Sequence, residues 1–131
     1  MLVYLSGSCK NVSVEERDSW RNYIEESLID GDIKVFNPNK KFSYDKNDPG
    51  NSKFVMDYFL QFVDRSDVVV VNLNNSALSV GTGMEVMRAV DKGKFIIGFG
   101  DTNIYDYTRD CCSVVFSDVD EVVDFVKSYF T

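Results

Sequence analysis

Glu85 is the residue of this sequence whose surroundings most favour chemistry. It follows the segment Ser79-Val80-Gly81-Thr82-Gly83 and opens an apolar run with helical spacing. Gly81 and Gly83 let the backbone turn tightly and approach a ligand, and the start of the helix behind them directs unpaired N–H groups at the same place. The helix dipole there would favour the ionised carboxylate, the form that a nucleophile needs. The alternative is that Glu85 is only a helix-start carboxylate that complements the dipole.

Missing residue types and motifs narrow the chemistry further. The 131 residues include no histidine, which excludes Ser-His-Asp and Cys-His nucleophiles, imidazole bases and zinc sites that contain histidine. Proton transfer must therefore fall to Asp, Glu, Tyr, Cys or Lys. Gly81-Thr82-Gly83 lacks the third glycine of a dinucleotide fingerprint, and Gly7-Ser8-Cys9-Lys10 lacks the spacing of a P-loop. We expect neither a metal nor an organic cofactor.

Charge and hydropathy limit the partners. The net charge is -7, the isoelectric point is about 4.5, and lysine and arginine do not cluster, so nucleic acid is a poor partner. Apolar runs such as Phe95–Phe99 are far shorter than the roughly 20 residues of a membrane helix. Three cysteines, two of them adjacent, indicate reduced thiols rather than a disulfide framework. We expect a cytoplasmic protein with a small-molecule ligand and no membrane partner.

Alternating strands and helices must position these residues. Five short apolar segments are expected to form strands: Leu2–Ser6, Ile33–Phe36, Asp67–Leu73, Phe95–Gly98 and Val114–Phe116. Helices are expected from a capping box at Ser13 and Glu16 to about Leu28, from Ser52 to about Arg65, from about Met84 to Lys92, and from Ser117 to about Phe130. Four consecutive valines from Val68 to Val71 indicate a strand covered on both faces, as in parallel sheets.

This order predicts one domain over residues 1–131, with a flavodoxin-like (Rossmann-like) α/β fold. Its core would be a five-stranded parallel sheet with helices on both faces. Ligands of such sheets bind at the carboxyl ends of the strands. That rule selects three loops as candidate ligand contacts: Gly7–Asn11, Asn37–Asn51 and Asn74–Gly83.

Three segments read together resemble the nucleoside 2-deoxyribosyltransferase superfamily. They are VYLSGS at Val3–Ser8, SDVVVVNL at Ser66–Leu73 and SVGTGMEVMRAVDKGKFIIGF at Ser79–Phe99. The resemblance runs in order over most of the chain, and it is densest in the stretch that contains Glu85. Within the superfamily, the chain is most similar to the branch of 2'-deoxynucleoside 5'-phosphate N-hydrolases.

The resemblance implies that Glu85 is the nucleophile that attacks the anomeric carbon of the sugar. Such an attack passes through an oxocarbenium-like transition state to a glycosyl-enzyme ester. Water would resolve that ester in a hydrolase, and a second base would resolve it in a transferase. Tyr4 matches the family tyrosine that lies near the nucleophile, although it could equally be an ordinary half-buried strand aromatic.

Two loops indicate a 5'-phosphate on the substrate. Six residues before Glu85, the transferases usually carry an Asp that accepts the 5'-hydroxyl, and this chain has Ser79. A carboxylate there would repel a phosphate, whereas a hydroxyl can donate to it. Gly7, Ser8 and Lys10 resemble the Gly-Ser-x-basic segment of the phosphate-directed hydrolases. Ordinary loop polarity would explain the same residues without a ligand.

Further expectations concern the acid and the assembly. The family's helix Asp falls on Phe59 in this chain, and Asp57 is two residues too early. Either the helix is irregular and Asp57 is a catalytic residue of the site, or Asp57 is a surface charge and Asp64 or another group assists the leaving base. The resemblance also implies a homodimer. Besides a hydrolase, the sequence leaves open a deoxyribosyltransferase that exchanges bases, which Ser79 disfavours, and a non-catalytic nucleotide-binding module.

Overall fold

The computed structural model describes residues 1–9, 12–29, 31–41, 52–76, 79–100 and 107–131. These residues build one sheet of five parallel strands in the order β2-β1-β3-β4-β5. The strands are β1 (Leu2–Ser6), β2 (Lys34–Phe36), β3 (Val68–Asn72), β4 (Phe95–Phe99) and β5 (Val114–Phe116). The helices are α1 (Val14–Ser27), α2 (Ser52–Arg65), α3 (Val80–Asp91), α4 (Tyr107–Asp110) and α5 (Val119–Tyr129), with a 3-10 turn at Pro38–Lys40.

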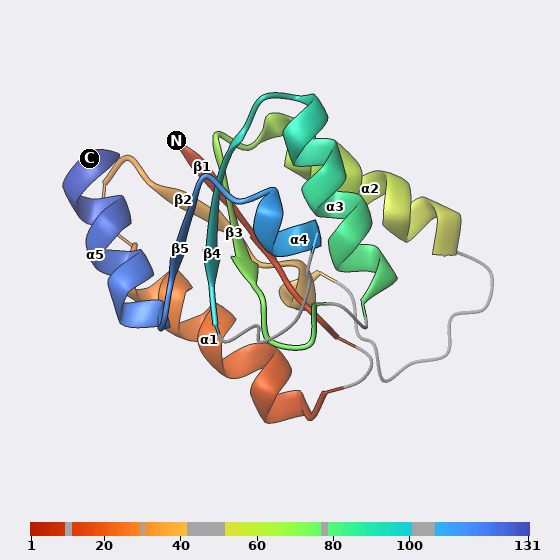
Figure 1. Ribbon diagram of the computed structural model, residues 1–131, viewed down its shortest axis with the longest axis horizontal. Coiled ribbons are helices and arrows are strands. Elements are labelled where there is room, and N and C mark those ends of the chain that lie inside the picture. The colour runs from red at the N-terminus through yellow and green to blue at the C-terminus, as the bar shows by residue number, and fades with distance from the viewer. Residues whose placement is uncertain (10–11, 30, 42–51, 77–78, 101–106) are drawn as a thin grey trace.

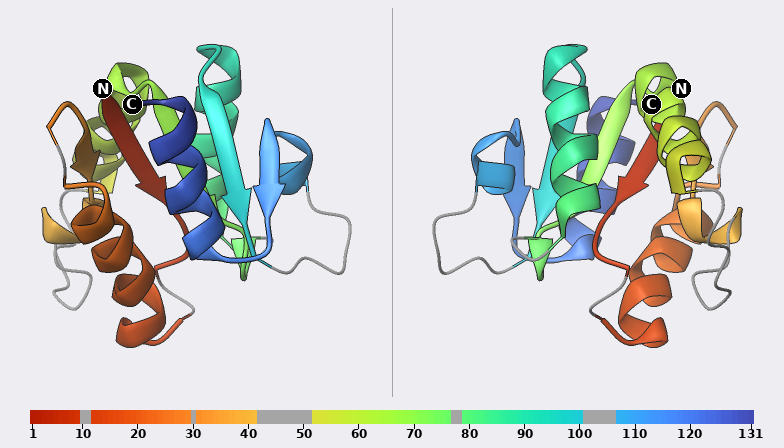
Figure 2. Two further views of the ribbon diagram at one scale, coloured as in Figure 1. Left: turned by 90° about the vertical axis from the view of Figure 1, so that its left-hand side faces the viewer. Right: turned by 90° about the vertical axis from the view of Figure 1, so that its right-hand side faces the viewer.

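Helices cover both faces of the sheet (Figures 1 and 2). α1 and α5 pack on one face, and α2 and α3 pack on the other. Alternation along each strand supplies the two cores, since successive side chains point to opposite faces. In β1, Val3 and Leu5 face α1 and α5, whereas Tyr4 faces α2 and α3. The flavodoxin-like fold with a five-stranded parallel sheet is therefore confirmed.

Helix caps confirm one boundary and correct two others. The Ser13 hydroxyl accepts a hydrogen bond from the Glu16 amide at 3.1 Å and starts α1 as expected. The last helix is capped by Asp118, one residue after the expected Ser117. α3 begins at Val80, about one turn before the expected Met84, because Ser79 caps it. Asp and Ser are both strong N-caps, so neighbouring cap residues compete and the sequence alone does not rank them.

The strand order places a change of direction between β1 and β3. The chain runs from β1 outward to β2 and then returns to add β3, β4 and β5 on the other side of β1. Loops that leave β1 and β3 therefore separate at this point, and open α/β sheets bind ligands in the resulting crevice. Over the described residues, no helix combines the length and the apolar character needed to span a bilayer.

Candidate active site

The Glu85 carboxylate is held by two hydroxyl groups from β1. Tyr4 donates to Oε2, and Ser6 donates to Oε1 at 2.8 Å. Tyr4 and Ser6 are two residues apart on one strand, so their side chains point to the same face, which is the face that α3 covers. Each carboxylate oxygen thus receives one hydroxyl donor, and the plane of the carboxylate is fixed at the carboxyl end of β1.

Packing holds Tyr4 in place. Its side chain is fully buried, and its ring stacks on Phe36 of β2 with centroids 5.4 Å apart. Phe36 in turn stacks on Phe62 of α2 at 4.1 Å. Aromatic side chains in such a stack lose little further freedom when the hydroxyl forms its hydrogen bond, because χ angles are already fixed by the packing. The Tyr4 hydroxyl therefore reaches Glu85 from a rigid support.

Burial and hydrogen bonds act in opposite directions on Glu85. Burial of the carboxyl group raises its pKa above the ordinary value of 4.5, because desolvation disfavours the charged form. The hydroxyls of Tyr4 and Ser6 and the positive charge of Arg21 lower the pKa and so oppose this rise. In the described residues, no second carboxylate forms a hydrogen bond with Glu85. The group is thus a desolvated carboxylate whose ionised form is favoured by two donors and a cation.

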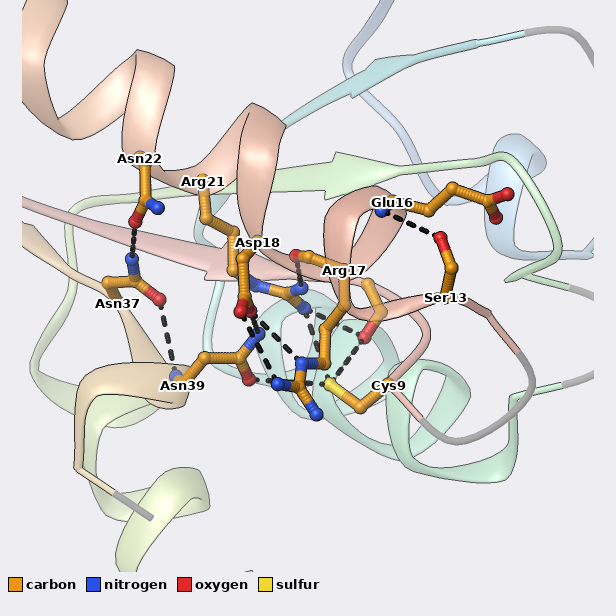
Figure 3. A network of polar contacts seen from close by, with 10 residues as sticks. Cys9, Ser13, Glu16, Arg17, Asp18, Arg21, Asn22, Asn37 and Asn39 are labelled. Atoms are coloured by element: carbon orange, nitrogen blue, oxygen red, sulfur yellow. Dashed lines mark hydrogen bonds and ion pairs between the residues drawn. The ribbon is translucent and has the colours of Figure 1, made fainter. Parts of the chain in front are cut away.

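Arg21 is a buried cation beneath the loop that follows β1, and composition did not single it out. It is only 1% exposed, one Nη donates to the Gly7 carbonyl at 2.9 Å, and the other Nη donates to the Arg17 carbonyl. Its guanidinium lies 4.5 Å from the centre of the Trp20 ring. Nε has no hydrogen-bond partner within the described residues. Figure 3 shows this guanidinium inside the polar network that joins α1 to the loop after β1.

The loop after β1 is packed closely against α1. A Cβ atom on Gly7 would lie 2.8 Å from a carbon of the Trp20 ring, so only glycine fits there. Ser8 is buried, and its hydroxyl donates to the Asn75 carbonyl at 3.0 Å, which joins the loops that follow β1 and β3. Asn75 has a positive φ of 62°, a conformation that asparagine tolerates better than most residues. Lys10 lies outside the described residues.

Ser79 and the two glycines lie at the start of α3. The Ser79 hydroxyl accepts a hydrogen bond from the Thr82 amide at 3.2 Å and lies 2.7 Å from the Thr82 hydroxyl. Gly81 and Gly83 were expected in a loop before the helix, but they lie inside its first turns. Glu85 accordingly lies in the second turn, where the helix dipole acts on it less than expected. A Cβ atom on either glycine would have no neighbour within 4 Å among the residues that the structure describes.

A cavity of about 350 Å³ opens at the same edge of the sheet, on the side that α1 covers. Its polar lining includes Ser8, Glu16 and the asparagines that follow β3, and Trp20 and Phe99 form its apolar wall. Ser8 lines this cavity and also joins the loops that follow β1 and β3, at the carboxyl ends of these strands. Within the described part of the chain, no three Cys, Asp or Glu side chains are grouped as a metal site requires.

Asp57 does not meet Glu85 in this structure. It is exposed and pairs with Lys53, one turn earlier in α2, at 2.6 Å. Phe59 is buried against the sheet, and two residues along a helix correspond to about 200° around its axis, so Asp57 points outward. Asp64 is also engaged elsewhere, since Arg88 of α3 donates to both of its oxygens at 2.7 Å. Arg88 lowers the pKa of Asp64, which keeps that carboxyl group ionised.

Sequence reasoning missed Ser6 and Arg21. Ser6 could have been found from its spacing, because it lies two residues after Tyr4 on the same strand and must share its face. Arg21 gave a weaker signal: it is a charged residue next to Trp20 on the apolar side of α1, where a cation is expected only if it has buried partners. Neither position carries a recognisable motif.

Solved structures support the fold. A conserved protein from Enterococcus faecalis V583 has 15% identity and a TM-score of 0.77, and the match covers 97% of each chain. The 2-deoxyribosyltransferase of Bacillus psychrosaccharolyticus has 21% identity and a TM-score of 0.70, over 95% of this chain and 91% of its own. The CMP N-glycosidase BcmB of Clostridium botulinum has 15% identity and a TM-score of 0.55, over 97% of this chain and 99% of its own.

Comparison with family models identifies a protein family in addition to the fold. No curated protein sequence matches the chain. A family model described as nucleoside 2-deoxyribosyltransferase like, however, matches residues 1–102, a range that includes β1, β3, α3 and all the contacts of Glu85 given above. Since this range is well over half of the 131 residues, the protein belongs to the nucleoside 2-deoxyribosyltransferase-like family.

Proposed function

We propose that the protein hydrolyses the N-glycosidic bond of a ribo- or 2'-deoxyribonucleoside 5'-monophosphate and releases the free base and a sugar 5-phosphate. The observation that carries this proposal is the Glu85 carboxylate, which is desolvated, bound by the Tyr4 and Ser6 hydroxyls, and placed at the ligand-binding edge of the sheet. Family membership supports glycosyl transfer as the reaction class. One structural relative is named as a CMP N-glycosidase, which acts on a nucleoside monophosphate.

The chemistry needs only Glu85, the substrate and water. A carboxylate oxygen forms a bond to the anomeric carbon while the N-glycosidic bond breaks. The electron pair of the broken bond leaves with the base, which takes up a proton from solvent water. Water then attacks the anomeric carbon, the ester bond breaks, and Glu85 returns as a carboxylate while the water gives up a proton. Tyr4 and Ser6 keep the carboxylate in one orientation through both steps, and Tyr4 stays next to the reacting atoms.

A phosphate group has a suitable place at the start of α3. Gly81 and Gly83 lie in the first turns of a helix, where glycine costs about 0.5–1 kcal/mol relative to alanine. Among the described residues no neighbour requires them, because none lies within 4 Å of a Cβ atom built at either position. Close approach of a ligand to this backbone accounts for both glycines. The free amides of the first turn and the Ser79 hydroxyl would then contact the phosphate.

The loop after β1 supports the phosphate from the opposite side. Gly7 and Ser8 are assigned to it by the family resemblance, and Lys10 is assigned in the same way. The buried Arg21 adds a positive charge beneath Gly7, and within the described residues no carboxylate forms an ion pair with it. A dianionic phosphate above this loop would balance the charge. The net charge of -7 does not prevent binding, since local donors decide the affinity of a phosphate site.

Exposed apolar side chains on the outer helices support a homodimer. Met84 and Met87 of α3 are 42% and 51% exposed, and Phe54 of α2 is 57% exposed. Val80 lies on the same side of α3 as the two methionines, at helical spacings of four and seven residues. Large apolar side chains that gather on one layer indicate a protein interface. We propose that a second copy of the chain covers this layer.

Base release from a panel of nucleotides tests the proposal. The pure protein is incubated with each ribo- and deoxyribonucleoside and with each 5'-monophosphate, and free base is followed by chromatography. A hydrolase releases base from monophosphates without any added base. If the sugar moves only when a second base is present, the protein is a transferase. If nucleotides raise the melting temperature but no base appears, the protein is a binding module.

A further inference from the structure

We infer that Ser6 is a positioning residue for Glu85, and that its hydroxyl fixes the orientation of the carboxylate for attack on the sugar. This inference rests on the proposed function, because it assigns Ser6 a task in the same reaction. Neither the family match nor the similar structures assign a role to this position.

The surroundings of the Ser6 side chain leave it one role, which is the hydrogen bond to Glu85. It is fully buried at the last position of β1, where a polar group without a partner would be costly. Within the described residues, Glu85 is the hydrogen-bond partner of its hydroxyl, at 2.8 Å from Oε1. The backbone of Ser6 is fixed because β1 pairs with β3 in register, with Ser6 opposite Val71. The hydroxyl therefore approaches Glu85 from a position that cannot easily move.

Tyr4 alone would not fix the carboxylate. A single donor on Oε2 leaves the group free to rotate about the bond to its γ-methylene carbon, whereas two donors on different oxygens define its plane. The two hydroxyls still leave lone pairs open on each oxygen, so that one of them can attack the anomeric carbon. When the ester forms, the other oxygen becomes its carbonyl and keeps its donor. Ser6 thus contributes geometry before the attack and a hydrogen bond after it.

Ser6 also acts on the charge of Glu85. A hydrogen bond to the ionised form lowers the pKa of the carboxyl group, in opposition to the rise that burial causes. The other groups that face Glu85 are Tyr4 from β1 and Arg21 from α1. On the helix side, Arg88 of α3 and Asp64 of α2 pair with each other. In the described structure, therefore, no other donor takes over the hydrogen bond when the Ser6 hydroxyl is removed.

The test compares Ser6→Ala with Ser66→Ala. Ser66 is a matched control, because it is also fully buried and its hydroxyl donates to the Val63 carbonyl at 2.7 Å, away from Glu85. We expect Ser6→Ala to lower kcat/KM for the monophosphate at neutral pH by about tenfold or more and to move the acid limb of the pH profile to higher pH. Ser66→Ala should leave the limb unchanged. Ser6→Cys, which keeps a weak donor, should recover part of the loss.

A second measurement does not depend on turnover. The carboxyl carbons of glutamate are labelled with 13C, and the Glu85 signal is identified by its absence in Glu85→Gln. Its titration should move to higher pH in Ser6→Ala or Ser6→Cys and stay in place in Ser66→Ala. If the wild-type protein releases no base, the proposed function fails, and this titration still decides whether Ser6 controls Glu85. An unchanged titration, or an unchanged acid limb and kcat/KM in Ser6→Ala, would overturn the inference.

Discussion

At the scale of single residues, the proposed reaction depends on a carboxylate that is desolvated and yet must be ionised. Burial raises the pKa of Glu85 above 4.5, and the form proposed to attack the sugar is the carboxylate. The ionised fraction therefore falls as the pH drops through this raised pKa. We predict that kcat/KM for base release decreases by about tenfold per pH unit below that point. Initial rates measured from pH 4 to 8 would show the acid limb, and a limb at or below 4.5 would contradict the assigned role of burial.

Ser79 offers a second test, because its hydroxyl oxygen is assigned two roles. Its hydroxyl caps α3, and it is proposed to contact the 5'-phosphate. Asp and Asn both serve as good N-caps, so Ser79→Asp and Ser79→Asn should each keep the helix. We predict that only Ser79→Asp lowers kcat/KM for monophosphates by at least about tenfold, since its charge repels the phosphate.

The two Ser79 variants are compared on the same substrates, with melting temperatures as a check on folding. Ser79→Asn serves as the control for the cap, because it lacks the charge. Equal losses in both variants would assign Ser79 to the helix cap alone. The serine at position 79, in place of the transferases' Asp, would then not explain a preference for a 5'-phosphate.

At the scale of elements, α3 carries a cost that the proposed phosphate contact would explain. Gly83 lies inside the helix, and a Cβ atom there would meet no described residue within 4 Å. We predict that Gly83→Ala stabilises the protein by about 0.5–1 kcal/mol and raises the melting temperature by a few degrees. The same methyl group would narrow the approach to the backbone, so nucleotide affinity should fall. Thermal unfolding with and without nucleotide measures both effects.

Gly93→Ala is the matched control for this prediction. Gly93 follows α3 with a φ of 68°, where alanine is strained, so its substitution should destabilise the protein by about 1 kcal/mol and leave nucleotide affinity unchanged. The interpretation of the α3 glycines would be wrong if Gly83→Ala bound nucleotide as tightly as the wild type.

The elements were largely predictable from the sequence, and the exceptions have physical causes. Buried strands such as β3 show as continuous valine runs, and all five strands were expected within a residue or two of their ends. The start of α3 was misplaced by about one turn, because glycines favour loops when only intrinsic propensity is considered. The cap at Ser79 overrides that preference. Asp57 was expected in the site only if α2 were irregular, and in the structure it is an exposed residue that pairs with Lys53.

At the scale of the whole molecule, the site was predictable only where a motif marked it. Glu85 and Tyr4 were expected to be close, and the structure brings them into contact. Ser6 and Arg21 became visible only after the fold defined which side of β1 and of α1 is buried. Sequence patterns identify groups of residues, but the partner of a single hydroxyl or guanidinium depends on packing between elements distant in the chain. Arg21, for example, reaches the Gly7 carbonyl 14 residues away.

The exposed apolar side chains on the outer layer of α2 and α3 lead to a prediction about the oligomeric state. If a second copy covers this layer, sedimentation of the wild-type protein should give a molecular mass of about twice the 14.9 kDa of one chain. Met87→Glu should shift the mass toward that of one chain, because an interface disfavours a buried, unpaired charge. Tyr129→Glu is the control, since Tyr129 is 73% exposed on α5, across the sheet. A wild-type protein that sediments as a single chain would contradict the dimer.

The central claim, that Glu85 forms the bond to the sugar, is tested most directly by single-turnover base release in wild-type protein and in Glu85→Gln. Glutamine keeps the size of the side chain, its carbonyl oxygen can accept from one of the two hydroxyls and its NH2 group can donate to the other, but it is a far weaker nucleophile. We expect Glu85→Gln to bind the monophosphate with nearly unchanged affinity and to release base at least about a thousandfold more slowly. Release within about tenfold of the wild-type rate would show that Glu85 is not the nucleophile.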